Sequence, residues 1–129
     1  MRAIDTNILV RFLTGDDPNQ AEKARKLIGE GEIFVATSVL LESEWVLRSA
    51  YDFSAEQIVG ALRAFAGLPG VTLEDAPLVS RALDWAEQGL DFADALHLAR
   101  AEGCSAFMSF DRKLAKVAAS LSEVKVLAP

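Results

Sequence analysis

Apolar residues along the chain alternate between short continuous runs and stretches with helical spacing. The short runs predict β-strands at residues 2–5, 33–36, 71–73, 105–110 and 124–127. The stretches between them predict helices at residues 6–13, 19–29, 39–50, 55–66, 77–88, 92–103 and 111–120. Strands separated by helices pair in parallel through right-handed crossovers. The pattern therefore predicts an α/β fold, a three-layer α/β/α sandwich around a central, mainly parallel sheet.

Several residues predict where these helices begin and end. We expect Ser38 to cap the helix at 39–50, and Ser54 with Gln57 to form a capping box for the next helix. Pro77 suits a first helical turn, and Gly89 is expected to stop that helix. The connecting loops are too short to be domain linkers. We therefore expect a single domain over residues 1–129.

Composition supports one globular domain. Of 129 residues, 51% are hydrophobic and 25% are charged, which is far from the composition of a disordered chain. One cysteine, Cys104, excludes an internal disulfide, and one histidine, His97, excludes a His-rich zinc site. The chain start has no apolar leader, and no apolar run has the length of a membrane span. We expect a cytoplasmic protein with no membrane partner.

Net charge argues against the simplest kind of nucleic-acid binding. The formal charge is -6, whereas electrostatic clamps use lysine and arginine to neutralise phosphates. The objection weakens if several acidic residues converge on one site, since divalent cations bound there would offset their charge and recruit phosphate. Whether a nucleic-acid function is compatible with this charge therefore depends on whether the acidic residues come together in one site.

Two acidic residues follow predicted strands directly. Asp5 ends the first strand and Asp111 follows the fourth, and parallel sheets bind ligands at the carboxyl ends of their strands. Each aspartate has an alternative role as the N-cap of the helix that follows, and one residue can fill both roles. Ser109, two residues before Asp111, is placed to orient it by hydrogen bonding.

Glu42 is the most informative single acid. No lysine or arginine lies three or four residues from it on its own helix, and its neighbours include Trp45 and Val46. A buried carboxylate without a partner either raises its pKa or requires a cation, which suggests a metal ligand. Glu44 differs, because Arg48 follows four residues later and predicts a solvated ion pair.

Asp91 and Asp94 stand three residues apart in the first turn of a predicted helix. Asp91 is expected to be the N-cap, with an accessory site role as the open alternative. Like charges this close repel unless a cation lies near, so Asp94 is the stronger candidate for the site. A set of oxygen ligands without histidine favours Mg²⁺, with Mn²⁺ as a possible substitute.

In the order and spacing of these motifs the chain resembles PIN-domain ribonucleases, and more narrowly the VapC-like toxins, over essentially its whole length. The resemblance rests on Ile4–Arg11 with Asp16–Pro18, Ser38–Glu42, Asp91–Leu96 and Ser109–Asp111. It implies that Asp5, Glu42, Asp94 and Asp111 are the catalytic, metal-binding acids, with Asn7 and Ser109 in support. Ser109 departs slightly from the family, in which threonine is more usual. The resemblance further implies RNA as substrate, a cognate antitoxin as partner and a homodimer.

The proposed activity is hydrolysis of RNA by metal-activated water, leaving 5′-phosphate and 3′-hydroxyl ends. Candidate contacts to the RNA backbone are Arg11, Arg112, Lys113 and Lys116. An ordinary solvated surface explains the same residues equally well. His97 is expected to be structural and Cys104 a core residue. Among the aromatic residues, Trp45, Trp85, Tyr51, Phe53 and Phe65 are expected to pack, although Leu47, Tyr51 and residues 58–65 are alternatives for a dimer or antitoxin surface.

Three other functions remain open at this point. A DNA-directed or structure-specific nuclease would use the same acids, because carboxylates and Mg²⁺ do not distinguish the two sugars. A receiver-type phosphoacceptor domain also binds Mg²⁺, but it needs adjacent acids after the first strand, and Asp5 stands alone. A non-catalytic RNA-binding or scaffold relative is disfavoured by the intact set of acids.

Overall fold

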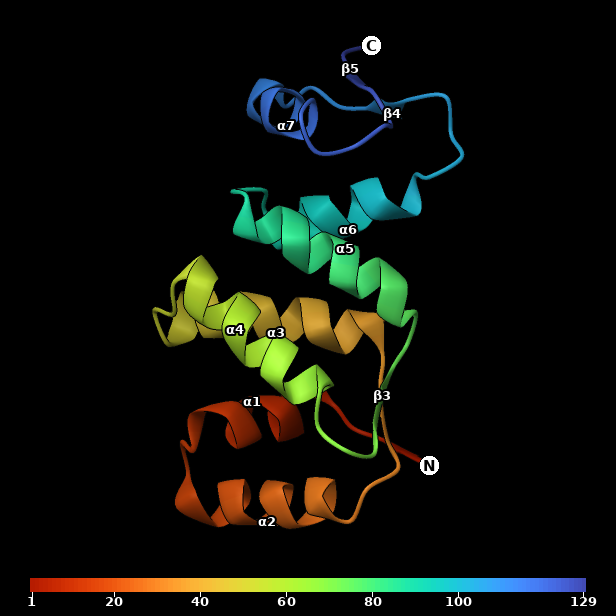
Figure 1. The fold of residues 1–129 in the computed structure, drawn as a ribbon. Coiled ribbons are helices and arrows are strands. Elements are labelled where there is room, and N and C mark those ends of the chain that lie inside the picture. The colour runs from red at the N-terminus through yellow and green to blue at the C-terminus, as the bar shows by residue number, and fades with distance from the viewer. The chain divides into compact units, whose positions relative to one another are not determined.

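A computed structural model describes all residues from Met1 to Pro129, and the chain forms two compact units. The N-terminal unit comprises Met1–Ala76 and the C-terminal unit Pro77–Pro129. In Figure 1 the first runs from red to green and the second from green to blue. Each unit is described separately below.

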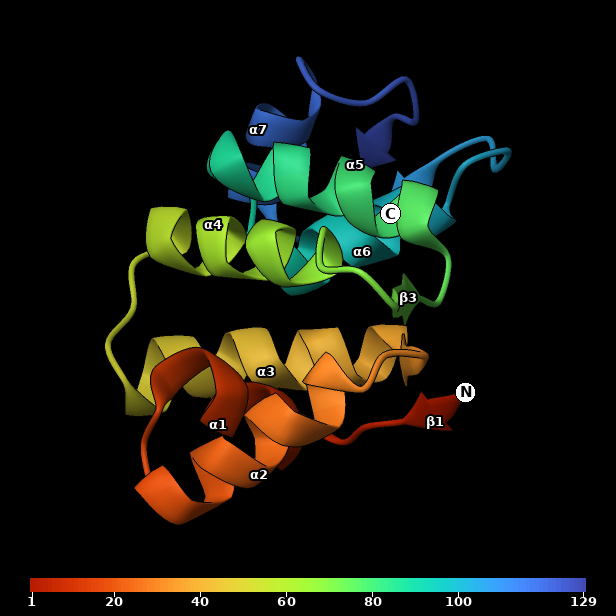
Figure 2. The same cartoon turned by 60° about the horizontal axis from the view of Figure 1, so that its bottom comes forward.

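The N-terminal unit contains a three-stranded parallel sheet with four helices. Its strands are β1 (Arg2–Ala3), β2 (Ile33–Val35) and β3 (Val71–Leu73), in the order β1-β2-β3. Its helices are α1 (Thr6–Thr14), α2 (Pro18–Gly29), α3 (Thr37–Ala50) and α4 (Ala55–Ala66). The central strand β2 supplies buried side chains, Ile33 and Val35, to the core. Helix α1 packs against both α2 and α3 (Figures 1 and 2).

Local signals explain most of the helix ends in this unit. Asp5 caps α1, and Gly15 ends it in the left-handed conformation with φ of 70°, which glycine adopts without strain. The predicted capping box of α4 is confirmed: Gln57 N–H donates to the Ser54 hydroxyl, and Ser54 N–H donates to the Gln57 side chain. These contacts span only three residues, so the sequence alone was enough to predict them.

The start of α3 differs from the prediction. The expected Ser38 cap is wrong, because the helix begins at Thr37 and its N-cap residue, Ala36, makes no side-chain hydrogen bond. The Thr37 N–H instead donates to the Glu74 carboxylate at 2.8 Å. Glu74 directly follows β3, so the cap of this helix comes from a neighbouring strand rather than from the local sequence.

The C-terminal unit contains a short parallel strand pair and three helices. In chain order these elements are α5 (Ala76–Glu87), α6 (Phe92–Arg100), β4 (Phe107–Met108), α7 (Arg112–Ala118) and β5 (Val126–Leu127). Helix α5 begins at the boundary between the units. In the pair, Phe107 lies opposite Val126. Helix α6 ends at Arg100, earlier than the predicted position 103, and both strands are shorter than predicted.

The fold class is α/β with parallel strands, as the sequence predicted. None of the helices combines the length and the apolarity that crossing a membrane would require.

Two packing predictions are wrong: Trp45 is 57% exposed, and Cys104 is an exposed free thiol. Helical spacing identifies one face of a helix but does not show whether another element covers it.

Candidate functional site

Asp5 lies two residues after β1, at the carboxyl end of the strand as predicted, although β1 ends at Ala3 rather than at residue 5. Ile4 N–H donates to the Phe34 carbonyl at 3.1 Å, which continues the pairing of β1 with β2 as far as the residue before Asp5. One carboxylate oxygen of Asp5 accepts from the Ile8 N–H at 3.1 Å, so Asp5 is the N-cap of α1. The cap fixes the carboxylate and engages only one of its oxygens. Capping and metal binding are therefore compatible at this residue.

Glu42 is tied to the same corner of the N-terminal unit by a residue that sequence reasoning missed. The buried Thr6, next to Asp5, donates its hydroxyl hydrogen bond to a Glu42 carboxylate oxygen. The signal that could have identified Thr6 is that it is a polar residue within the apolar pattern of α1. The contact links the first turn of α1, where Asp5 sits, to the acid on α3.

The physical argument that singled out Glu42 is partly wrong. Glu42 is exposed rather than buried, it has Thr6 as a partner, and its neighbour Trp45 is exposed as well. The predicted pair of Glu44 and Arg48 is confirmed at 2.8 Å. It is not fully solvated, since Glu44 is only 6% exposed. Helix α3 therefore buries Glu44, which is paired with Arg48, and leaves Glu42 exposed.

The C-terminal unit brings three acids into electrostatic interaction. Asp91 caps α6 as predicted, its carboxylate accepting from the Asp94 N–H at 3.1 Å. Partial burial raises the pKa of Asp94, and the negative charges of Asp91 and Asp111 raise it further. The nearby His97 acts in the opposite direction. The predicted repulsion around Asp94 is therefore present in the structure.

Asp111 is held by contacts on both sides of the residue. Its carboxylate accepts from the Leu114 N–H at 3.0 Å, which makes it the N-cap of α7. Its own N–H donates to the Ser109 hydroxyl at 3.0 Å. Ser109 thus orients the backbone of Asp111 rather than its carboxylate. Asn7, the other predicted supporting residue, lies exposed in the first turn of α1.

The four principal acids fall two in each unit, Asp5 and Glu42 in the first and Asp94 and Asp111 in the second. Within neither unit do three or more acidic, histidine or cysteine side chains gather closely enough to hold a metal ion. The donor set nevertheless fits a hard divalent cation, because all four donors are carboxylates. The surroundings of Asp94 are also negative, which a cation would relieve.

The candidate RNA-binding residues have different surroundings. Lys113 and Lys116 are exposed on α7 and line a surface pocket of about 450 Å³, together with Gln88, Val117, Ser120 and Leu121. Arg112 is also exposed. Arg11, in contrast, is hydrogen-bonded to three side chains of the N-terminal unit, those of Asp16, Gln20 and Tyr51. The alternative of a dimer or antitoxin surface at Leu47 and residues 58–65 is disfavoured, since Leu47, Ile58, Leu62 and Phe65 are buried.

Comparison with known proteins places the chain in a family. The sequence profile of the PIN domain matches residues 3–120, across both units. No curated protein sequence matches the chain. Among solved structures, VapC20 of Mycobacterium tuberculosis, a toxin that cleaves the sarcin-ricin loop, is similar with 20% sequence identity and a TM-score of 0.44, over 97% of this chain and 99% of that one. Because the profile spans nearly the whole chain, the protein belongs to the PIN domain family, a family of nucleases that generally use divalent metal ions.

Proposed function

We propose that the protein is a metal-dependent endoribonuclease and the toxin of a VapBC-type toxin–antitoxin pair, with residues 1–129 acting as one PIN-like domain. Family membership supports a nuclease and disfavours the receiver-type alternative. The observation that carries the proposal is the match of the PIN domain profile to residues 3–120. The environment of Asp94, where burial and two further aspartates oppose its ionisation, supports it. An acid kept in such surroundings is typical of a functional site that binds a cation.

Four residues would hold the ion, namely Asp5, Glu42, Asp94 and Asp111. Mg²⁺ is the cofactor that this donor set favours, and Mn²⁺ would substitute for it. When bound, such an ion acts as a Lewis acid and lowers the pKa of water. Asp91 supports the set through its charge beside Asp94 and its cap on the same helix. Asn7 and Ser109 complete the supporting residues.

The protein itself prepares these carboxylates before any ion binds. The caps at Asp5 and Asp111 each use one oxygen and hold the side chain in place. Thr6 restrains Glu42 in the same way. Fixed donors lose little conformational freedom on binding, which is the physical meaning of a preorganised site.

RNA would be held through its phosphates on the exposed face of α7. Lys113 and Lys116 line a pocket together with Gln88, Val117, Ser120 and Leu121, and none of these residues is aromatic. The two lysines, without an aromatic ring beside them, favour contact with a phosphate over a stacked base. Arg112 adds positive charge beside them, and Arg11 is the remaining sequence candidate. These contacts would partly offset the net charge of -6.

The partners and the location follow from the toxin assignment. We propose a cognate antitoxin protein, a homodimer and a cytoplasmic setting. The exposed apolar residues of the C-terminal unit, Met108, Phe110 and Leu127, offer surface for such contacts.

A DNA-directed or structure-specific nuclease is the alternative function, because the proposed acids do not select the sugar.

The test compares the purified protein with its Asp5→Asn and Asp94→Asn variants on total cellular RNA, with Mg²⁺ or with EDTA. The exposed acid Glu22 on α2 provides a matched control, Glu22→Gln. We expect cleavage by the wild type and the control in Mg²⁺ alone, with 5′-phosphate and 3′-hydroxyl ends. Cleavage in EDTA, equal cleavage by the aspartate variants, or cyclic phosphate ends would overturn the proposal. Cleavage of single-stranded DNA without cleavage of RNA would support the alternative.

A further inference from the structure

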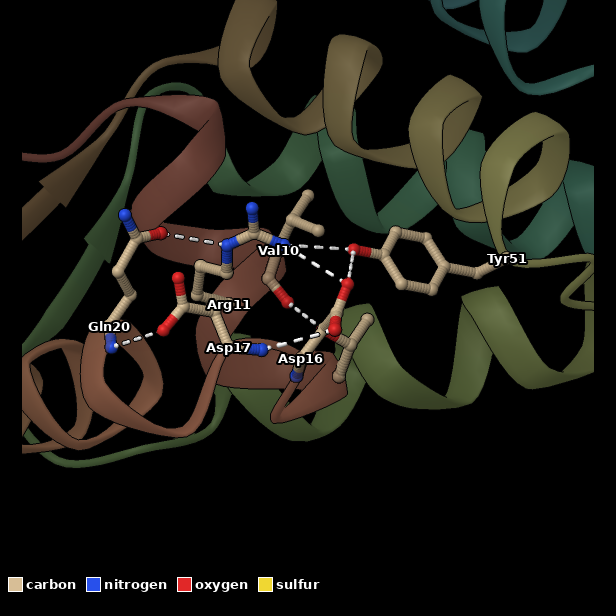
Figure 3. Close-up of polar contacts among 7 residues, drawn as sticks. Val10, Arg11, Asp16, Asp17, Gln20 and Tyr51 are labelled. Carbon is tan, nitrogen blue, oxygen red and sulfur yellow. Dashed lines mark hydrogen bonds and ion pairs between the residues drawn. The ribbon is translucent and has the colours of Figure 1, made fainter.

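Arg11 lies at the centre of a group of four polar side chains that we call the Arg11 clasp, made of Arg11, Asp16, Gln20 and Tyr51 (Figure 3). The Arg11 Nε donates to the Gln20 amide oxygen at 2.9 Å. One terminal nitrogen donates to the Tyr51 hydroxyl at 3.1 Å and to Asp16 at 3.3 Å. Tyr51 donates in turn to the same Asp16 oxygen at 2.8 Å.

The clasp joins segments that are distant in sequence. Arg11 is on α1, Asp16 is in the turn that follows, Gln20 is on α2, and Tyr51 directly follows α3. Asp16 accepts hydrogen bonds from both Arg11 and Tyr51, so the three groups form a closed triangle of charge-assisted contacts. Arginine is suited to this position because its planar guanidinium donates in several fixed directions, which lysine does not.

These contacts compete with the role that the sequence predicted for Arg11. Its side chain is only 28% exposed, and its hydrogen bonds to Gln20, Tyr51 and Asp16 occupy Nε and one terminal nitrogen. A phosphate that bound through these same nitrogens would have to displace Asp16, which is a charged acceptor already in place. Lys113 and Lys116 differ, since both are exposed and line an open pocket.

Helix α1 is therefore attached to α3 at two levels. Near its start, Thr6 donates to Glu42, in the middle of α3. Five residues later, Arg11 contacts Tyr51 at the end of α3. The buried Leu9 and Val10 already pack α1 into the core, and the two polar attachments restrain its rotation further. The second attachment thus helps to hold Asp5 and Glu42, which occupy the first corner, in a fixed relation.

We infer that Arg11 is a positioning residue for the proposed acidic site and that it does not contact RNA. The inference rests on the proposed function, because the positioned residues are the proposed metal-binding acids Asp5 and Glu42. Arg11 acts through α1, and Tyr51 and Asp16 act with it as one unit. Removing any member of the triangle is expected to loosen the first turn of α1 without removing a phosphate contact.

The experiment measures RNA cleavage by Arg11→Gln, Tyr51→Phe and the double variant, with the exposed Arg25→Gln on α2 as the control. We expect kcat to fall about fivefold or more, since small misplacements of reacting groups are costly. KM and the dependence of RNA affinity on salt should stay at the wild-type values. The double variant should be no worse than Arg11→Gln alone, because residues of one network are not additive. Tyr51→Phe removes a single hydroxyl and keeps the test valid if Arg11→Gln does not fold.

Amide hydrogen exchange gives a readout that needs no activity. The Ile8 N–H, bound to the Asp5 carboxylate, should exchange faster in both variants, while the Gln57 N–H in the capping box of α4 should not change. Unchanged exchange of the Ile8 N–H would overturn the positioning role of Arg11, even if the wild type cleaves no RNA. A higher KM and a salt dependence reduced by about one phosphate contact in Arg11→Gln, with Tyr51→Phe like the wild type, would assign Arg11 to RNA binding instead.

Discussion

The hydroxyl of Thr6 donates a hydrogen bond to the carboxylate of Glu42, across 36 positions of sequence. Through this contact the residue after Asp5 restrains the acid on α3, so two of the proposed metal ligands share one fixed corner of the N-terminal unit. The donor is buried and the acceptor is exposed, which leaves the carboxylate accessible.

Replacing Thr6 with valine keeps the shape of the side chain and removes the donor. Because hydrogen bonds to charged groups contribute about 1.5–3 kcal/mol, we expect Thr6→Val to lower the free energy of unfolding by about 1–2 kcal/mol. RNA cleavage should fall as well, since Glu42 loses its restraint. Urea unfolding and single-turnover cleavage would measure the two effects. The exposed Thr72→Val in β3 serves as the control, and equal behaviour of the two variants would contradict the prediction.

Replacing Asp94 with asparagine should stabilise the protein without Mg²⁺ and abolish its stabilisation by Mg²⁺. The pKa of Asp94 is raised, so its ionisation above that pKa costs the folded protein stability, and the neutral asparagine avoids this cost. In EDTA at neutral pH, Asp94→Asn should therefore have a higher Tm than the wild type. Adding Mg²⁺ should raise the Tm of the wild type but not that of the variant. A variant that gains as much from Mg²⁺ as the wild type would remove Asp94 from the metal ligands.

Lys113 and Lys116 are expected to contact RNA phosphates. Each replacement by glutamine should reduce the slope of log affinity against log salt by about one unit per lost phosphate contact. The exposed Lys23→Gln on α2 is the matched control and should keep the wild-type slope. Binding is best measured with the Asp5→Asn variant, so that the RNA stays intact. Unchanged slopes for both α7 lysines would place the RNA elsewhere on the protein.

Gly70 should tolerate no larger residue. It has φ of +80°, and an added Cβ would lie 2.7 Å from the Gly31 Cα and 2.9 Å from the Glu32 nitrogen. Both neighbours are backbone atoms that cannot move aside, so Gly70→Ala should cost about 2–4 kcal/mol of stability. Gly60, in the middle of α4, has no atom within 4 Å of its added Cβ. Gly60→Ala should instead stabilise by about 0.5–1 kcal/mol, and thermal unfolding of the pair tests both signs.

Ser43 should be replaceable with a gain in stability. Its hydroxyl is fully buried on α3 and has no hydrogen-bond partner. Because an unsatisfied buried polar group costs about 1–3 kcal/mol and alanine favours helices, Ser43→Ala should raise the free energy of unfolding by about 1 kcal/mol or more. Urea unfolding measures the change. A loss of stability would show that the hydroxyl has a partner, such as an ordered water molecule.

The sequence by itself determined the features that depend on near neighbours. Hydrophobic periodicity predicted the order and type of the elements, and the caps at Ser54 and Asp91 were predicted correctly. The caps at Asp5 and Asp111 were alternatives that the sequence left open beside a site role, and the structure contains both. Each such contact joins residues three apart, so its geometry follows from the helix itself. The pairing of Glu44 with Arg48 was predicted for the same reason.

Only the tertiary structure decided which partners meet across longer distances. It gave Thr37 its cap from Glu74, tied Glu42 to Thr6, and placed Arg11 against Tyr51. It also reversed the expected burial of Glu42 and Glu44 on α3. These features could not be predicted because periodicity shows which residues share a helix face, whereas their burial and charge partners depend on the elements that fold against that face.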